Sequence, residues 1–202
     1  MTAGSSDFFD VAERQRACRA FTDQDVPDEL VEQVLRAATR APSAENRQPW
    51  VFVVVREAAT RQALGELMRQ AWQGGARQFS EGRLAPGLLA EVDRGATGSL
   101  AQAPVHVVVG ADLDRGLAQT VGSSLFPAVQ NLLLAATALG LGSVLTTLAT
   151  RQAGEVRRLT GLAESVEIVA LIPLGWPVRP PRPGARRPLS EVAFREMADH
   201  PW

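Results

Sequence analysis

The sequence contains no lysine and no tyrosine, and it has one cysteine and two histidines in 202 residues. The absence of lysine excludes pyridoxal phosphate chemistry, which needs a Schiff-base lysine, and the lysine of a nucleotide-triphosphate loop. Cys18, His106 and His200 are too few for a Cys/His metal site or a Ser-His-Asp triad. We therefore expect no resident metal and no catalytic side chain, and we assign the chemistry to a bound cofactor.

Excess charge of one sign and long hydrophobic runs are also missing. The formal net charge is −1, so no overall field attracts nucleic acid or an anionic membrane. Uninterrupted apolar runs fall far short of the roughly 20 residues that cross a bilayer. A single cysteine cannot form an internal disulfide. We expect a protein of the reducing cytoplasm that binds neither nucleic acid nor membrane.

The stretch 41–52 separates a predicted helix from a predicted valine-rich strand. Pro42 ends the helix, and Pro49 stiffens the entry to the strand at 50–55. A serine and an amide pair, Ser43 with Asn46 and Gln48, lie between the prolines. A stiff polar loop on a rigid scaffold is a common place to hold a ligand. An ordinary helix-to-strand connection with turn residues is the alternative.

Three arginines, Arg14, Arg16 and Arg19, gather at the end of a helix predicted over residues 7–20. Cations near a helix C-terminus are mildly favourable, so the group could be a solvated cap. Guanidinium groups also pair phosphate oxygens bidentately, so the same group could hold a phosphate.

Helices and strands alternate along the chain, with no repeat and no linker. The pattern predicts further helices over 58–72, 124–139 and 150–158, and strands over 104–109, 143–147 and 166–174. We therefore predict one domain over 1–202, with a central mixed sheet flanked by helices. The helix over 124–139 is apolar on nearly every side, which predicts that a second subunit covers one of its faces.

Two segments depart from this pattern. Residues 73–99 are punctuated by glycine, which is typical of a functional lid or mobile excursion, or of a poorly ordered insertion. Prolines keep the tail at 175–202, Pro181 and Pro183 included, extended over a surface. The tail is either a flexible basic terminus or, given Leu189 and Phe194, a segment that docks on another surface.

Five motifs in order resemble the nitroreductase family of flavin-dependent oxidoreductases, over nearly the whole chain. They are Arg-Ala-Cys-Arg-Ala-Phe at 16–21, Ala-Pro-Ser-Ala-Glu-Asn-Arg-Gln-Pro-Trp at 41–50, Ala-Val-Gln-Asn-Leu-Leu-Leu-Ala-Ala at 128–136, the segment 140–147, and Pro-Leu-Gly-Trp-Pro at 173–177 with Arg-Arg-Pro at 186–188. Each motif is weak alone, and the five together are specific.

The resemblance implies an α+β homodimer that holds two FMN molecules at its interface, with the long apolar helix at its core and the 175–202 tail on the partner subunit. It implies an enzyme that uses NAD(P)H to reduce nitroaromatic, quinone-like or related electron-poor acceptors by ping-pong hydride transfer at the flavin N5. The alternatives are an oxidase or dehydrogenase of a biosynthetic intermediate, a flavin-fragmenting enzyme, and a non-catalytic flavin-binding module.

The resemblance also assigns cofactor-binding positions, to Arg16, Ala17, Arg19, Pro42, Ser43, Ala44, Asn46, Gln48, Thr146, Thr147, Arg186 and Arg187. Arg16 and Arg19, helped by Arg186 or Arg187, would hold the phosphate. The 42–46 loop would reach the flavin from the partner subunit, and the threonine pair would lie beside the isoalloxazine.

Two departures from the family pattern bear on the phosphate end. Gln15 stands where members often carry arginine, and Ala17 stands where they often carry serine. The basic residue that members place near the flavin pyrimidine is often lysine, and Arg94 is the candidate here.

Overall fold

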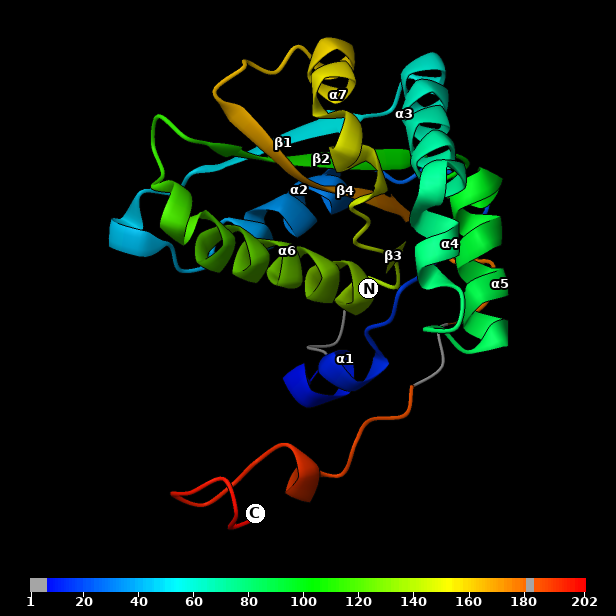
Figure 1. Ribbon diagram of the computed structural model, residues 1–202. Helices are drawn as coiled ribbons and strands as arrows, with labels where there is room; N and C mark the ends of the chain where they lie inside the picture. The colour runs from blue at the N-terminus through cyan, green and yellow to red at the C-terminus, as the bar shows by residue number, and fades with distance from the viewer. Residues whose placement is uncertain (1–6, 181–183) are drawn as a thin grey trace.

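The computed structural model describes residues 7–180 and 184–202; Pro181 and Pro183 of the predicted tail lie outside this range. Helices cover both faces of a four-stranded sheet (Figure 1). The helices are α1 (Phe8–Arg14), α2 (Asp28–Ala38), α3 (Ala58–Ala71), α4 (Arg77–Ser80), α5 (Pro86–Arg94), α6 (Val121–Ala138) and α7 (Ala153–Thr160). The strands are β1 (Trp50–Val55), β2 (Val105–Asp112), β3 (Gly142–Ser143) and β4 (Val166–Gly175). Short 3-10 or π turns are η1 (Ala44–Asn46), η2 (Trp72–Ala76), η3 (Gly95–Ser99), η4 (Ala118–Thr120), η5 (Leu148–Gln152) and η6 (Leu189–Glu191).

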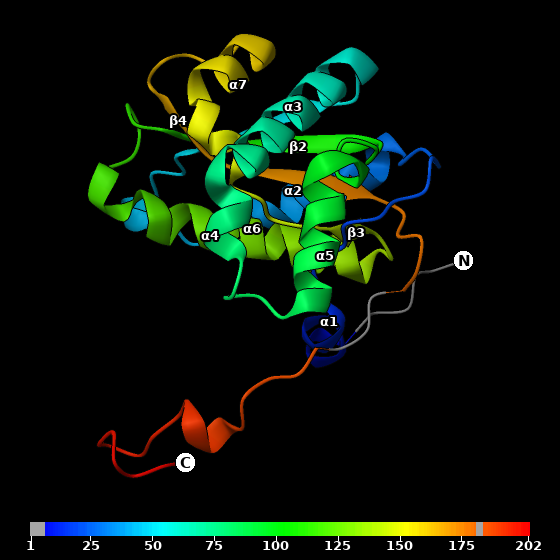
Figure 2. The same cartoon turned by 45° about the vertical axis from the view of Figure 1, so that its right-hand side comes forward.

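The α+β class is confirmed, but the sheet is antiparallel where a mixed one was predicted. Its strand order is β1-β2-β4-β3, and each neighbouring pair runs antiparallel. A single parallel bridge joins Ala17 to Ser143 outside the named strands. Between β1 and β2 the chain runs out along α3 and back along α5, as Figure 2 shows. Two helical passes return the chain to the end of β1 from which it left, so β2 runs in the opposite direction.

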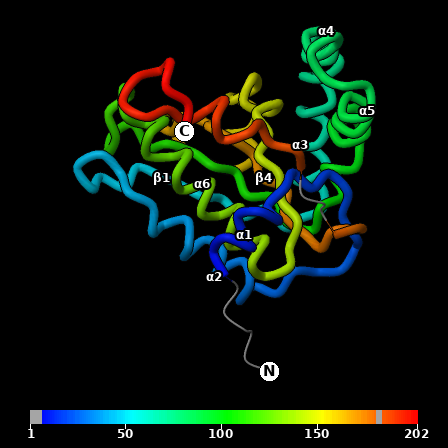
Figure 3. The backbone as a smooth tube through the Cα atoms, turned by 90° about the horizontal axis from the view of Figure 1, so that it is seen from below, coloured from blue at the N-terminus to red at the C-terminus, as the bar shows by residue number. Residues whose placement is uncertain are grey.

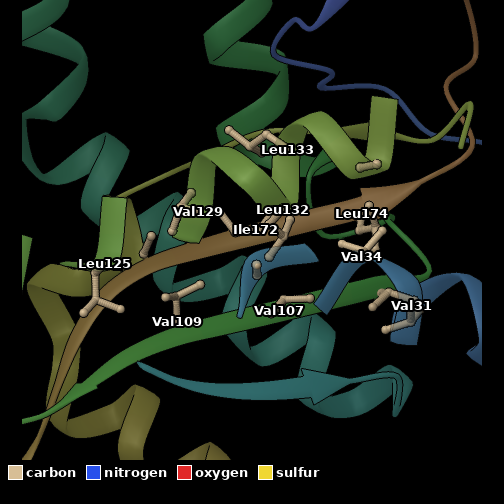
Figure 4. Close-up of a cluster of buried hydrophobic side chains, with 14 of the residues drawn as sticks. Val31, Val34, Val107, Val109, Leu125, Val129, Leu132, Leu133, Ile172 and Leu174 are labelled. Carbon is tan, nitrogen blue, oxygen red and sulfur yellow. The ribbon is translucent and has the colours of Figure 1, made fainter. Parts of the chain in front are cut away.

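The central strand β2 separates two cores. Val107 and Val109 contact the cluster formed with α2 and α6, whereas Val108 belongs to the cluster with Leu64 of α3. Successive side chains of a strand point to opposite faces, so the valine run fills both cores. Figure 4 shows the α6 side of this packing, with Leu132 directed at the sheet.

The apolar helix α6 has one buried side and one outer side within a single chain. It begins at Val121 after Thr120, three residues before the predicted start at residue 124. Ser123, Phe126 and Gln130 are exposed on its outer side, and Phe126 retains 49% exposure. By length and composition the segment 118–138 could cross a membrane, with a mean hydropathy of 1.2, but core helices share this property and half of the segment is buried.

Several predicted elements have different bounds. The first helix ends at Arg14, because Ala17 and Phe21 form bridges to Ser143 and Pro177 in place of helical hydrogen bonds. The strand predicted over 143–147 is reduced to β3, and the helix predicted over 150–158 becomes η5 followed by α7. The glycine-rich stretch 73–99 is mostly helical, as α4 and α5 with the turns η2 and η3.

The C-terminal tail leaves the body below α1 (Figures 1 and 2). Seen from below, it passes in front of α6 (Figure 3), so it lies on the outer side of that helix. Its large apolar side chains are exposed, among them Leu189, Phe194 and Trp202.

Candidate cofactor site

The segment after α1 runs alongside β3. Ala17 forms a parallel bridge with Ser143, and the Cys18 amide donates to the Ser143 carbonyl at 2.9 Å. Burial raises the pKa of the Cys18 thiol, which keeps it protonated and donating to the Ala20 carbonyl. The bridge thus fixes the Arg16–Arg19 segment beside the chain that leads to the threonine pair.

A cavity of about 200 Å³ brings part of the predicted site together. Arg19, Thr146 and Thr147 all line it. The other lining residues are Trp72, Val92, Ala96, Leu100, Val144, Leu145 and Leu148. Arg19 and the threonines are more than 120 residues apart in sequence, and the fold places them around one space.

Arg16 lies toward the tail. Its Nη2 donates to the Gly184 carbonyl and its Nη1 to the Gln15 carbonyl, both at 2.9 Å. Arg186 and Arg187 follow Gly184 by two and three residues and are exposed. Arg19 lies well beyond the end of α1 and does not cap it, whereas Arg16 donates to the carbonyl of Gln15, the C-cap residue. Arg14, in the last turn, pairs with Asp10 on the same helix.

Two buried polar atoms in these segments have no hydrogen-bond partner within residues 7–180 and 184–202: Arg16 Nε and Ser143 Oγ. A buried donor without a partner costs about 1–3 kcal/mol. A ligand rich in phosphate, hydroxyl and carbonyl oxygens supplies the missing acceptors, so the residues present fit FMN. Sequence reasoning missed Ser143, which it treated as a strand residue.

The predicted loop 42–48 has an unusual backbone. Asn46 and Gln48 have φ values of 54° and 49°, and Glu45 has 53°. The Gln48 amide donates to Ser43 Oγ at 3.0 Å, and Gln48 Nε2 donates to Asn46 Oδ1 at 3.2 Å. Left-handed conformations at non-glycine residues persist only where the surroundings hold them, and they concentrate at ligand sites.

This loop and the cavity lie at opposite ends of α6. The Ala44 amide donates to Ser124 Oγ at 3.1 Å, near the N-terminus of the helix. Ser143 follows its C-terminus, so about 20 Å of helix lies between the two. Figures 1 and 3 show the same separation. Pro42, Ser43, Ala44, Asn46 and Gln48 therefore do not join Arg19 within one chain.

The segment 73–99, predicted as an excursion, supplies one wall of the cavity together with the residues that flank it. Trp72, Val92, Ala96 and Leu100 all line it, and the indole Nε1 of Trp72 donates to Asp93 Oδ1 at 2.9 Å. The spacing of Val92, Ala96 and Leu100 by four residues was a helical signal, but the surrounding glycines obscured it. Arg94 is exposed and is not among the lining residues.

His106 is a core residue of β2, in agreement with the sequence analysis. Its Nε2 lies 2.9 Å from the carbonyl of Leu100, whose side chain lines the cavity. Burial lowers the pKa of His106 to about 4, so the ring is neutral near pH 7. The ring therefore stabilises the cavity wall and does not exchange a proton near pH 7.

Two larger hollows, of about 350 and 580 Å³, lie around Asp23 and Arg61. Neither is lined by a predicted cofactor residue. Arg61 is already engaged there, because its Nε and Nη1 donate to the carbonyls of Arg56 and Ala103. The smaller cavity at Arg19 is the one that collects predicted residues.

Comparisons with known proteins agree with this fold. The NADH dehydrogenase of Thermus thermophilus is 32% identical over 217 aligned positions, which cover 90% of this chain and 92% of that protein. Iodotyrosine deiodinase, crystallised with FMN and 3-iodo-L-tyrosine, superposes with a TM-score of 0.76 at 26% identity and covers 95% of this chain and 100% of that one. A nitroreductase with bound FMN from Bacteroides fragilis has the same fold, with a TM-score of 0.71 at 21% identity over 96% of this chain and 100% of that one.

A family model described as the nitroreductase family matches residues 12–176. The matched range includes the Arg16–Arg19 segment, the 42–48 loop and the threonine pair, and it ends at the start of the tail. The chain belongs to the nitroreductase family.

Proposed function

We propose that this protein is an FMN-dependent oxidoreductase that uses NAD(P)H to reduce nitroaromatic, quinone-like or related electron-poor acceptors. The observation that carries the proposal is the cavity that Arg19, Thr146 and Thr147 line. Arg16 and Ser143, on the same two chain segments, each hold a buried polar atom with no partner among the described residues. Family membership and the FMN-bound relatives support the choice of cofactor. The single cysteine fits a reducing cytoplasm.

The arginines divide the work of binding. Arg16 contacts the tail next to Arg186 and Arg187, so this group suits the phosphate, which guanidinium binds in a charge-assisted way. Arg19 shares its cavity with the threonines, so it suits the ring. Bound FMN would supply the electron transfer, and the protein would orient the ring and keep competing reactants away.

A second subunit completes the site in this proposal. The cavity of about 200 Å³ is smaller than the roughly 300–1,000 Å³ of common ligand sites. The 42–48 loop lies at the far end of α6, where a two-fold-related copy could present it to the other cavity. The outer side of α6 and the tail lie on the same side of the molecule and expose Phe126, Leu189 and Trp202. We propose that these surfaces meet in a homodimer.

Purification and anaerobic reduction test the function. We expect a yellow protein that releases FMN, not FAD, on denaturation, and whose flavin absorbance bleaches on addition of NADH or NADPH. Reoxidation by a quinone or a nitroaromatic compound would then regenerate the spectrum. A preparation that takes up no FMN would refute the proposal. Bound FMN that neither nucleotide reduces would exclude NAD(P)H as the donor and leave either the second candidate below or a binding module.

Reductive dehalogenation is a second candidate, and the likeness to iodotyrosine deiodinase favours it. In this reaction two electrons and a proton replace an aromatic carbon–halogen bond by carbon–hydrogen, and halide leaves. Release of iodide from 3-iodo-L-tyrosine under chemical reduction would support it. Reduction of nitroaromatics without any halide release would favour the first function.

A further inference from the structure

One face of the α5–η3 segment holds Arg19 at three points. Glu91, Gly95 and Ser99 are spaced four residues apart, so they lie on the same side of this helical segment. Each contacts a different part of Arg19: the guanidinium, the aliphatic stem and the backbone carbonyl. The α5–η3 segment thus contacts Arg19 from its backbone to its guanidinium.

The contacts are specific. Glu91 Oε1 lies 3.3 Å from Arg19 Nη1. A Cβ on Gly95 would lie 3.2 Å from Arg19 Cδ, so the absence of a side chain at this position allows the stem to pack closely. The Ser99 hydroxyl donates to the Arg19 carbonyl. The Arg19 side chain is consequently 19% exposed, whereas Glu91 is 46% exposed.

The Arg19–Glu91 pair places a positive and a negative charge at the cavity wall. Among the described residues that line the cavity, Arg19 is the one with a charged side chain. Glu91 does not line the cavity, but its carboxylate places a negative charge next to the Arg19 guanidinium. A partly buried pair is screened less by salt than an exposed pair, so both charges act on the cavity.

We propose that Glu91 is a positioning residue that lowers the reduction potential of the flavin by holding Arg19 and offsetting part of its charge. This inference rests on the proposed function, in which the ring occupies the cavity beside Arg19. Reduction adds negative charge to the ring, and a nearby positive charge favours that change. Glu91 opposes it, which makes the reduced cofactor a stronger reductant toward electron-poor acceptors.

The test is the midpoint potential of the FMN-loaded, full-length protein, measured by equilibrium reduction against reference dyes. We expect Glu91→Gln to shift the potential to a more positive value, because it removes a negative charge and keeps the shape. Glu91→Asp keeps the charge and should stay near the wild-type potential. Glu81→Gln is the matched control, because Glu81 pairs with Arg77 in the same hairpin but does not contact Arg19.

The shift should also shrink as ionic strength rises, which a purely structural effect would not do. Wild type and Glu91→Gln with equal potentials, or a shift to a more negative value, would overturn the inference and leave the flavin assignment intact. An equal shift in Glu81→Gln would overturn it too, because the effect would then not depend on Arg19. A chain that binds no FMN would refute the proposed function and this inference together.

Discussion

Strand β2 and the C-terminal tail are both rich in apolar side chains, yet the fold treats them in opposite ways. Every residue from Val105 to Ala111 is buried. In the tail, Leu189, Phe194 and Trp202 keep 59%, 43% and 64% of their surface exposed. The difference indicates that one chain completes its core but leaves an apolar surface uncovered. The candidate site is divided in a similar way. The cavity at Arg19 lies within the chain, whereas the 42–48 loop lies at the other end of α6.

The largest effect should come from the core side of this comparison. Leu132 of α6 is fully buried, so Leu132→Ala should lower the free energy of unfolding by about 2–5 kcal/mol. Leu189→Ala removes the same atoms from the tail and should change the unfolding of the isolated chain by less than about 0.5 kcal/mol. Urea denaturation at fixed protein concentration measures both. If Leu189→Ala greatly lowered the free energy of unfolding at high dilution, the tail would belong to the core of the single chain.

The second prediction concerns pH. The folded chain lowers the pKa of His106 from 6.5 to about 4, so the unfolded state binds more protons between these values. The corresponding stability is present above about pH 6.5 and is lost as the pH falls toward 4. A difference of about 2.5 pKa units is worth about 3 kcal/mol.

Denaturation series between pH 4 and 7 measure this dependence. His106→Gln should flatten it, since glutamine does not titrate. His200→Gln, which changes the exposed histidine of the tail, should match wild type. If the free energy of unfolding changed with pH by the same slope in all three proteins, carboxylates would account for the acid sensitivity.

The third prediction concerns the cavity. Arg16→Ala or Arg19→Ala should weaken FMN binding by about 1.5–3 kcal/mol, or roughly 10- to 150-fold, since each removes a charge-assisted hydrogen bond. Arg36→Ala is the control, because Arg36 is exposed on α2 and pairs with Glu32. Flavin fluorescence titration measures the three dissociation constants. Equal dissociation constants for the three variants would show that neither Arg16 nor Arg19 binds FMN.

The smallest effect should come from the uncovered surface. Phe126 is half exposed on α6, so Phe126→Ala should weaken dimerisation by about 1 kcal/mol for each subunit and leave the fold unchanged. Gln130→Ala, one turn further along the same face, removes a polar side chain and should have less effect. Sedimentation over a concentration series compares the two, and a monomer at all concentrations in wild type would contradict the interface.

The sequence predicted the valine-rich strands well, because valine runs favour a sheet. The bounds of Trp50–Val55 were predicted to the residue, although this edge strand is only partly buried up to Val54. The sequence did not predict the end of α1, because Ala17 and Phe21 pair with residues more than 100 positions away. Nor did the sequence predict the direction of β2, which depends on the glycine-rich stretch folding into the helical pass that returns the chain along α5.

The site was predictable where a motif carried it and not where packing did. The motifs placed Arg19 and the threonine pair in the cofactor site, and the fold brings all three to one cavity. Trp72, Glu91 and Ser143 were missed, because each has a role only through a neighbour that is distant in sequence. The part assigned to the partner's loop depends on a second chain and stays a prediction.

The central claim is that two subunits share each flavin site, and mixed dimers test it most directly. One chain would carry Arg19→Ala and the other Asn46→Asp, which suits the left-handed backbone at Asn46 but loses the amide donor. Each homodimer should bind FMN weakly. In a shared arrangement the mixed dimer has one site with both changes and one with neither, so we predict one FMN per dimer bound with wild-type affinity. Two weak sites and no wild-type site would show that each flavin is held within one chain.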